Sequence, residues 1–334
     1  MANPYTVYRF IAEEQRKHKD ATGEFSNLFR DLIVAVKEIN QHVRKAGLGE
    51  ALGEMESENA SGDAQKKLDV MANEILKDAM CHGGHLCAIG SEEEAGLVSI
   101  PIEHPTGDYV MLFDPLDGSG NANIGLDVGT IFSIRERMSR EKESPGGLAD
   151  VLRPGSEQVA AGYVLYGAST HLVFTTGNGV HHFTYDPAVG EFFLTEANVQ
   201  LQETTKVFSA NLANRHLFGD AENRFLDELT GATDPSGKGL KYRWMKCMVA
   251  EVHSALMEGG MYFYPTKKSG EGKIRFLYEW QPMAMLFEQA GGASTDGTQS
   301  LLTRVPTELH EKCGGLIGTK AAVARYEALV KEYR

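Results

Sequence analysis

The segment from residue 109 to residue 121, YVMLFDPLDGSGN, constrains the fold of this chain more than any other part of the sequence. Residues 109–113 are an unbroken apolar run, which is typical of a strand buried on both faces of its sheet. The run ends at Asp114, so a carboxylate follows the carboxyl end of the strand, where open α/β sheets bind their ligands. This pattern predicts an α/β protein with a site at the edge of the sheet.

The residues after this strand have the composition of a metal and phosphate site. Pro115 has no N–H and is expected to interrupt the regular strand, so that Asp117 returns close to Asp114. Residues 118–120, Gly-Ser-Gly, offer backbone N–H groups suited to a phosphate. Two carboxylates beside such a turn are what Mg²⁺-assisted phosphoryl chemistry requires. The same residues are also compatible with a plain turn that closes a core strand, because Asp and Gly are common turn formers.

The chain length and the net charge limit how many domains and which kinds of binding partner are expected. A chain of 334 residues exceeds one typical core, which predicts one large domain or two closely packed ones. The net charge of −13 argues against a general affinity for nucleic acid or anionic membranes. No apolar run approaches the ~20 residues that a membrane span needs. Four cysteines do not make a disulfide framework in a chain of this length, and the polar amino terminus lacks a signal-peptide core, so a cytoplasmic location is expected.

The segment Cys81-His-Gly-Gly-His85-Leu-Cys87 contains four potential zinc ligands. Their spacing matches no common zinc finger, and such tight clustering strains a tetrahedral site. A helix end that leads through two glycines into a buried strand is the simpler interpretation, with a zinc site as the alternative.

Hydrophobic periodicity predicts alternating helices and strands along the chain. Helical spacing covers residues 6–19, 25–43, 65–80, 214–229, 242–257, 281–289 and 321–333. Strand patterns cover residues 86–90, 109–113, 160–166, 171–176, 180–185, 191–195, 260–264 and 273–278, with another strand near residue 206. Residues 49–64 and 135–158 have the composition of loops. A change of pattern near residue 200 divides the chain into residues 1–200 and 201–334.

Acidic residues recur at predicted strand ends, within a series of motifs spread along the chain. These motifs are Gly62-Asp63-x₄-Leu68-Asp69, Ser91-Glu-Glu-Glu94, Asp114-Pro-Leu-Asp-Gly-Ser119, Gly129-Thr-Ile-Phe132, Phe208-Ser-Ala-Asn211, Gly259-Gly-x₃-Tyr264-Pro and Lys273-x-Arg-x-Leu-Tyr-Glu279. In their order and spacing they resemble the class I fructose-1,6-bisphosphatases over nearly the whole chain. The resemblance implies a layered αβαβα sugar-phosphatase fold with mixed sheets. Residues 1–200 would then be a metal and regulatory-type domain, and residues 201–334 a domain for the sugar phosphate.

The resemblance also implies which residues form the site. The implied metal ligands are Glu92, Glu93, Asp114, the carbonyl of Leu116, Asp117 and Glu279, holding about two or three Mg²⁺ ions per subunit, with Mn²⁺ as a possible substitute. The implied catalytic groups are Asp69 and Glu93, which would deprotonate a water, together with Asp63. The implied substrate contacts are Gly118, Ser119 and Arg275 at the 1-phosphate, Lys273 at the sugar, and Asn211, Tyr264 and Arg243 at the second phosphate. Arg243 would come from a neighbouring subunit, which implies a homotetramer.

The implied reaction is Mg²⁺-dependent hydrolysis of fructose 1,6-bisphosphate to fructose 6-phosphate and phosphate, in gluconeogenesis or in a carbon-fixing (Calvin) cycle. Trp244 and Asn214 stand where the family has tyrosines, so sedoheptulose-1,7-bisphosphatase activity, alone or in addition, is an alternative. Glu279-Trp-Gln-Pro282 replaces Glu-Cys-Asn-Pro. An inositol- or nucleotide-phosphate phosphatase and a non-catalytic sugar-phosphate sensor are further rivals.

A regulatory difference is expected near the amino terminus. In AMP-sensitive relatives a lysine and an arginine bind the nucleotide, and this chain has Asp108 and Glu136 at those positions. The turn that would hold the nucleotide phosphate persists as Thr22-Gly23-Glu24. Two cations have become two anions, so the enzyme is expected to be insensitive to AMP.

Overall fold

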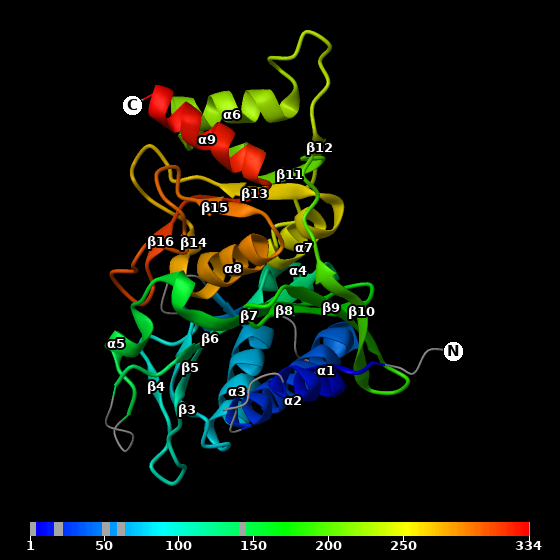
Figure 1. Ribbon diagram of the computed structural model, residues 1–334, viewed down its shortest axis with the longest axis vertical. Helices are drawn as coiled ribbons and strands as arrows, with labels where there is room; N and C mark the ends of the chain where they lie inside the picture. Colours follow the sequence, from blue (N-terminus) through cyan, green and yellow to red (C-terminus); the bar gives the residue numbers. More distant parts are fainter. Residues whose placement is uncertain (1–4, 17–22, 49–53, 59–63, 140–144, 334) are drawn as a thin grey trace.

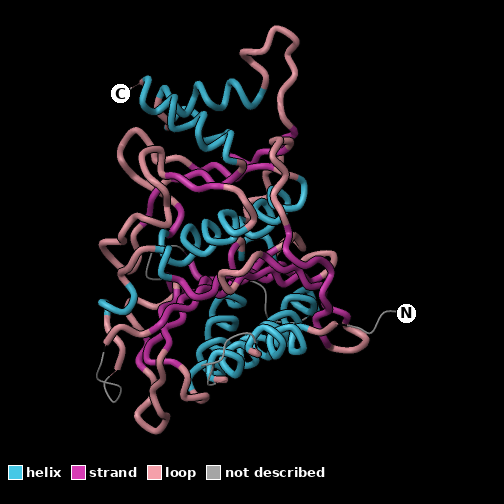
Figure 2. The backbone as a smooth tube through the Cα atoms, viewed as in Figure 1, coloured by secondary structure: helices cyan, strands magenta, loops and turns pink. Residues whose placement is uncertain are grey.

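The computed structural model describes residues 5–16, 23–48, 54–58, 64–139 and 145–333 of the chain. These residues form five layers, which follow one another along the long axis of the molecule (Figure 1). Helices α1–α3 form the first layer, an eight-stranded sheet the second, α7 and α8 the third, a five-stranded sheet the fourth, and α6 and α9 the fifth (Figure 2). The layered αβαβα fold with mixed sheets is therefore confirmed.

The first layer covers one face of the large sheet. It consists of α1 (Val7–Gln15), α2 (Glu24–Lys45) and α3 (Lys67–Cys81), with a 3₁₀ turn at Ala46–Leu48. The ring of Phe29 on α2 lies 5.9 Å from that of Phe132 and 4.7 Å from that of Phe174, both on the sheet. This burial of aromatic rings fixes the helices on the sheet, because large apolar side chains contribute most of the energy of such a layer.

The eight-stranded sheet has the order β10-β9-β8-β7-β6-β5-β3-β4. Its strands are β3 (Leu86–Ser91), β4 (Val98–Ser99), β5 (Tyr109–Asp117), β6 (Val128–Glu136), β7 (Gln158–Tyr166), β8 (Thr170–Thr175), β9 (Val180–Asp186) and β10 (Glu191–Val199). Only the β3–β5 pair within this sheet is parallel. The carboxyl ends of β3 and β5 therefore lie side by side, and the acidic residues that follow them are brought together.

The five-stranded sheet has the order β12-β11-β13-β17-β15. Its strands are β12 (Lys241–Tyr242), β11 (Val207–Ala210), β13 (Gly260–Tyr264), β17 (Gly315–Gly318) and β15 (Ala293–Thr295). Helices α6 (Asp220–Thr230) and α9 (Lys320–Glu332) cover its outer face. Smaller elements are α4 (Ser119–Ala122), α5 (Leu148–Val151), 3₁₀ turns at Gly155–Glu157 and Leu212–Leu217, and the strand pairs β1 (Glu54–Glu58) with β2 (Ala64–Lys66) and β14 (Ile274–Arg275) with β16 (Lys312–Cys313).

The middle layer joins the two sheets. Helices α7 (Met248–Glu258) and α8 (Gln281–Gln289) contact β6 and β7 on one side and the strands of the smaller sheet on the other. One apolar cluster contains Ile131 and Tyr163 from the large sheet, Val249 from α7, and Tyr262 from the smaller sheet. The division into two domains near residue 200 stays a prediction, since this shared core connects the halves on either side of it. In the described part of the chain, no helix has the length and apolarity of a membrane span.

Two predicted elements near the smaller sheet are wrong. The strand expected over residues 273–278 is limited to β14, after which Phe276–Trp280 forms a π-helix. The helix expected over residues 242–257 begins only at Met248. Residues 242–247 do not continue this helix, because Lys246 has a φ of +56° and Tyr242 pairs with β11 as part of β12.

Three further expectations are also revised. Strand β5 does not stop at Phe113 but continues through Pro115 to Asp117, with a register shift against β6 between Asp114 and Asp117. The helix expected over residues 214–229 is divided into a 3₁₀ turn and α6 by Gly219. The loop expected over residues 49–64 includes the described strand β1, and its residues 49–53 and 59–63 lie outside the described part.

Candidate active site

The carboxyl ends of β3 and β5 place the first group of acidic side chains. Glu92 and Glu93 follow β3 directly, and the Glu92 N–H donates to the carbonyl of Phe113 on β5 at 3.1 Å. Asp114 is 4% exposed, and its Oδ1 accepts the N–H of Leu116 at 3.0 Å. The register shift brings Asp117 back to the same edge, so these side chains converge as the sequence predicts, even though Pro115 is part of the strand.

Asp117 is held by the amino-terminal end of α7. Its Oδ2 accepts the N–H of Val249 at 2.7 Å and the thiol of Cys247 at 3.1 Å. Gly118 has a φ of +74°, and a Cβ at this position would lie 2.7 Å from the Cβ of Cys247. Glycine is therefore required both by the left-handed backbone and by the close approach of the chain before α7.

The π-helix Phe276–Trp280 places Glu279 opposite these residues. Glu279 is 3% exposed, and its Oε2 accepts the N–H of Arg275 at 2.5 Å. The guanidinium of Arg275 forms a salt bridge with Glu92 and lies 4.0 Å from Glu279. Single-turn π-helices are frequent at functional sites. The π-helix Phe276–Trp280 places the carboxylate of Glu279 beside Asp114 and Asp117, at the edge of the eight-stranded sheet.

These residues surround a cavity of about 370 Å³. Carboxylate oxygens of Asp114, Asp117 and Glu279 lie within 4.8 Å of one another there. The other predicted site residues that line the cavity are Asp69, Glu92, Glu93, Leu116, Gly118, Ser119, Asn211, Tyr264, Lys273 and Arg275. Asp63 lies outside the described residues. Arg243 lies away from the cavity lining, and its Nη2 forms a salt bridge with Glu258 at 2.6 Å.

Burial and mutual repulsion favour protons on this cluster in the metal-free protein. Burial raises the pKa of Glu279 to about 7. Burial, followed by the charge of Glu92, raises the pKa of Asp114 well above its usual range, and burial also raises the pKa of Asp117. Such shifts mean that the site lacks enough positive charge of its own. Hard oxygen ligands in this number fit a divalent cation such as Mg²⁺, whose charge would remove the repulsion.

Asp69 lies in the first turn of α3, at the side of the cavity. Its Oδ2 accepts the N–H of Lys66 at 3.1 Å, and its Oδ1 is buried without a hydrogen-bond partner among the described residues. Burial, with a smaller contribution from the charge of Glu93, raises the pKa of Asp69 to about 7. A carboxyl group with such a pKa at the side of the cavity can exchange a proton near neutral pH.

The cavity also contains residues that the sequence analysis missed. Glu251 is 1% exposed on α7, and its Oε1 accepts the N–H of Met245 at 2.8 Å. Burial raises the pKa of Glu251 to about 8. Nothing in the local sequence, Met-Val-Ala-Glu-Val-His-Ser from residue 248, distinguishes Glu251 from an acidic residue on a solvent-exposed helix face. Cys247 and Lys246 also line the cavity, but neither belongs to a pattern that distinguishes it from a core or surface residue.

The far end of the cavity is built around the hydroxyl of Tyr264. This oxygen accepts the side-chain N–H of Asn214 at 3.3 Å and that of Asn211 at 3.5 Å. The ring of Trp244, which lines the cavity, lies 6.1 Å from the ring of Tyr264. The amide of Asn214 is thus directed at Tyr264, while Trp244 takes part in the surface that a ligand would meet.

The alternative zinc site in the segment 81–87 is not supported by the geometry. Among the described residues, two groups bring three potential ligands within 4.8 Å: the carboxylates above, and His171, His182 and His253. The segment itself is the end of α3 at Cys81, a turn, and the start of β3 at Leu86. The interpretation as a helix end leading into a buried strand is therefore correct.

Comparisons with known proteins agree with this fold. Residues 5–197 match the family described as "Fructose-1-6-bisphosphatase, N-terminal domain", and residues 201–331 match "Fructose-1-6-bisphosphatase, C-terminal domain". A fructose-1,6-bisphosphatase class 1 of Maridesulfovibrio salexigens is 42% identical over 336 aligned positions, covering 99% of each chain. The chain belongs to the fructose-1,6-bisphosphatase class 1 family. The crystal structure of the Leishmania major fructose-1,6-bisphosphatase in holo form superposes with a TM-score of 0.91 at 32% identity, over 98% of this chain and 99% of the other.

Magnesium is expected to stabilise this fructose-1,6-bisphosphatase family member more at about pH 8 than at about pH 5. Asp69 and Glu279 have folded-state pKa values of about 7, against roughly 4 in an unfolded chain. Without metal, the folded state holds protons that the unfolded chain releases, so the free energy of unfolding falls as the pH rises through this window. Thermal unfolding with and without Mg²⁺ should show a rise in Tm that is larger at the higher pH by about 5 °C or more.

The control for this measurement is Asp117→Asn, which removes one charged carboxylate from the cluster. In this variant the Mg²⁺-dependent rise in Tm should be smaller at both pH values. An equal rise in Tm at both pH values for the unmodified protein would contradict the charge assignment.

Proposed function

We propose that this protein hydrolyses the 1-phosphate of fructose 1,6-bisphosphate in a Mg²⁺-dependent reaction, giving fructose 6-phosphate and phosphate. The observation that carries the proposal is the convergence of the carboxylates of Asp114, Asp117 and Glu279 beside the turn at Gly118 and Ser119. The full-length relative of Maridesulfovibrio salexigens, named a fructose-1,6-bisphosphatase, supports the choice of substrate. The protein would then be a phosphoric monoester hydrolase of carbohydrate metabolism.

The chain offers a complete set of oxygen ligands for divalent cations. Glu92, Glu93, Asp114, the Leu116 carbonyl, Asp117 and Glu279 line the cavity together and would hold Mg²⁺ or Mn²⁺. When bound, such cations polarise the phosphoryl oxygens and lower the pKa of a bound water. Arg275 now forms a salt bridge with Glu92, and it would be available to the phosphate once other positive charge neutralises that carboxylate.

The remaining roles follow from the chemistry of the side chains. Asp69 and Glu93 would accept the proton of the attacking water, with Asp63 as a further candidate outside the described residues. Backbone N–H groups at Gly118 and Ser119 begin the short helix α4 and would bind the 1-phosphate. The attack is in line with the leaving sugar oxygen, as phosphoryl transfer requires. Lys273 would bind the sugar because it lines the same cavity.

The second phosphate would lie at the end formed by Tyr264 and Asn211. Arg243 lies outside the cavity of its own chain, and its side chain is 40% exposed, so it could reach the cavity of a neighbouring subunit. The homotetramer that the family resemblance implies is therefore part of the proposal. A non-catalytic sugar-phosphate sensor is disfavoured, because binding alone does not need a buried Asp69 whose pKa burial raises to about 7.

Replacing Asp117 by Asn is expected to lower kcat at least ~100-fold with saturating Mg²⁺, because a charged metal ligand is lost. Asparagine keeps an oxygen that can accept the Val249 N–H, so the local structure should persist. Phosphate release from fructose 1,6-bisphosphate is the measurement, with circular dichroism as the check of folding. The matched control is Asp234→Asn at an exposed turn, which should keep full activity. Full activity of Asp117→Asn, or of the unmodified protein in excess EDTA, would refute metal-dependent catalysis.

AMP is expected to inhibit weakly or not at all. Glu136 is paired with Tyr109 across β5 and β6, and the Asp108 carbonyl accepts the Arg137 N–H at 2.7 Å, so both acidic residues lie at the same end of neighbouring strands. Phe25 in the first turn of α2 contacts Tyr109, which places the turn at Gly23 nearby. A nucleotide phosphate brought there would be repelled.

The test is an AMP titration of the phosphatase activity at saturating Mg²⁺. The double variant Asp108→Lys with Glu136→Arg restores the positive charges and should make inhibition by AMP at least ~10-fold stronger. Half-inhibition of the unmodified enzyme at low micromolar AMP would show that this reasoning is wrong.

Sedoheptulose 1,7-bisphosphate is expected to be hydrolysed with a kcat/KM within about tenfold of that for the six-carbon substrate, a gap of ~1.4 kcal/mol. Two tyrosine hydroxyls that would bind the distal phosphate are replaced by Trp244 and Asn214, and each such hydrogen bond to a charged group is worth roughly 1.5–3 kcal/mol. The shorter Asn214 leaves room for a longer sugar. A side-by-side kinetic comparison decides between the two substrates.

The reverse change, Trp244→Tyr with Asn214→Tyr, should shift the preference toward fructose 1,6-bisphosphate. The single variant Trp244→Phe is the control, because it removes the indole without adding a hydroxyl. A thousandfold preference of the unmodified enzyme for the six-carbon substrate would be incompatible with this interpretation of the pocket.

A further inference from the structure

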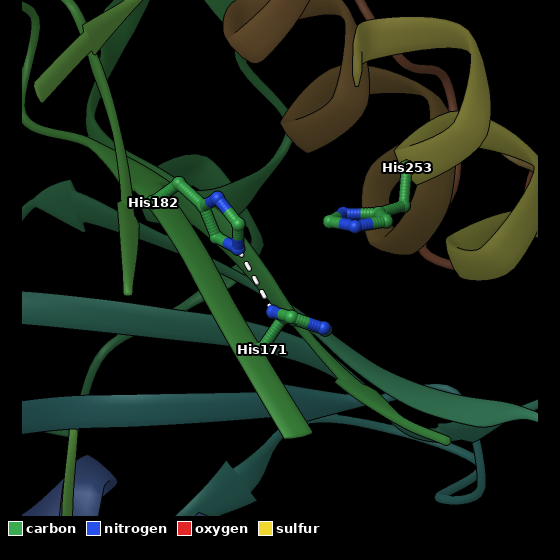
Figure 3. Close-up of side chains that lie close together, drawn as sticks. All are labelled: His171, His182 and His253. Atoms are coloured by element: carbon green, nitrogen blue, oxygen red, sulfur yellow. Dashed lines mark hydrogen bonds between the residues drawn. The ribbon is translucent and has the colours of Figure 1, made fainter. Parts of the chain in front are cut away.

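Three histidines from distant parts of the chain meet between the large sheet and the middle helices. His171 lies on β8, His182 on the neighbouring strand β9, and His253 on α7 (Figure 3). In the sheet, His171 pairs with Thr184, so their side chains lie on the same face. His182 precedes Thr184 by two residues on β9, so its side chain lies on that face too. One ring nitrogen of each histidine lies within 4.8 Å of those of the other two.

Hydroxyl groups around the cluster orient two of the rings. Ser169 Oγ lies 2.7 Å from His171 Nε2, and Tyr163 Oη lies 2.8 Å from His253 Nδ1. His171 Nδ1 and His182 Nε2 face each other at 2.8 Å, the contact drawn in Figure 3. Metal-binding histidines usually have such a hydrogen bond at their other nitrogen, because it fixes the ring and its tautomer. His171 Nδ1 also lies 3.3 Å from Thr184 Oγ1, so an ion here would replace the contacts of His171 Nδ1 with His182 Nε2 and Thr184 and would take His253 Nε2 as its third ligand atom.

The three imidazoles are in the protonation state that metals require. Burial lowers the pKa of His182 to about 4 and that of His253 to about 3, and it also lowers the pKa of His171, with the charge of Asp127 acting in the opposite direction. All three rings are therefore neutral near pH 7 and have lone pairs to offer. A transition metal binds neutral imidazole without having to displace a proton from a cationic ring.

We propose that His171, His182 and His253 form a binding site for one divalent transition-metal ion, with Zn²⁺ as the best-suited ion and a fourth position open to water. Zinc binds histidine nitrogen at about 2.0–2.1 Å, and because the rings of His171 and His253 are stacked at 25° with their centroids 5.1 Å apart, at least one of them has to rotate so that its lone pair points to the ion. Imidazole selects zinc, copper or nickel, whereas Mg²⁺ prefers oxygen. This site is therefore chemically distinct from the carboxylate cluster in the cavity.

An ion at this position would link α7 to β8 and β9. His253 lies one helical turn beyond Val249, whose N–H holds Asp117. The ion would thus cross-link the helix that supports the carboxylate cluster to the large sheet. The measurable consequence is a higher Tm of the full chain in Zn²⁺, on top of the stabilisation by Mg²⁺.

The experiment uses the full chain carrying Asp117→Asn, so that binding at the carboxylate cluster is weakened, with Mg²⁺ in excess. Equilibrium dialysis with Zn²⁺ should give one ion per chain, and Co²⁺ in its place should give the intense visible absorption of a four-coordinate site. His253→Gln and His171→Asn should each weaken binding at least tenfold and abolish the Zn²⁺-dependent rise in Tm. His216→Gln, at an exposed histidine outside the cluster, should bind like its parent.

A measurement on the chain without histidine substitutions keeps the test independent of the folding of the variants. Cu²⁺ bound to the Asp117→Asn protein should show coupling to imidazole nitrogens in its electron paramagnetic resonance spectrum. The proposal is overturned if that coupling is absent, or if folded His253→Gln protein binds Zn²⁺ as tightly as its parent. Loss of phosphatase activity in Asp117→Asn has no bearing on either outcome, so this test is separate from that of the proposed function.

Discussion

Repulsion between buried carboxylates is the constraint on which the centre of this structure depends. At an effective dielectric of about 20, two like charges about 4 Å apart repel by roughly 4 kcal/mol, and Asp114, Asp117 and Glu279 converge within 4.8 Å. The fold opposes this repulsion with N–H donors to each carboxylate and with the guanidinium of Arg275 beside Glu92. The raised pKa values show that these contacts compensate only part of the charge. The arrangement is therefore one that a cation completes.

Asp117 and Glu92 are held by groups from the opposite half of the chain. Asp114 and Asp117 belong to β5, whereas the Val249 N–H is at the start of α7 and Arg275 ends β14. The middle helices therefore contribute in two ways. They cover both sheets with apolar side chains, and the amino-terminal end of α7 donates a hydrogen bond to Asp117. A segment ending near residue 200 would keep the acidic residues of β5 without Val249. The site is accordingly a property of the complete five-layer arrangement.

Predictions from the sequence were correct where a residue pattern fits only one kind of element. They were wrong where contacts between distant residues determine the backbone. The apolar run ending in Asp114 could be recognised because a doubly buried strand needs such a run. The π-helix that carries Glu279 could not, since the alternation before it suits a strand, and the contact of Glu279 with the Arg275 N–H lies outside that pattern. Glu251 was missed because nothing local distinguishes a helix acid that faces a cavity from one in solvent. Residue types therefore predicted the chemistry better than the local backbone.

The residues that differ from the family pattern lie in two places, behind Glu279 and in the lining of the cavity. Trp280 and Gln281 pack behind Glu279: the Trp280 indole donates to the Cys313 carbonyl at 3.2 Å, and Gln281 accepts from the buried Arg135. Both therefore support the π-helix and the loop that Arg135 holds through the Pro154 carbonyl. Trp244 is different, because its ring is part of the cavity lining near Tyr264. Trp280 and Gln281 lie behind the carboxylates, so a difference in substrate preference is expected from Trp244 in the cavity lining and from Asn214, whose amide donates to Tyr264.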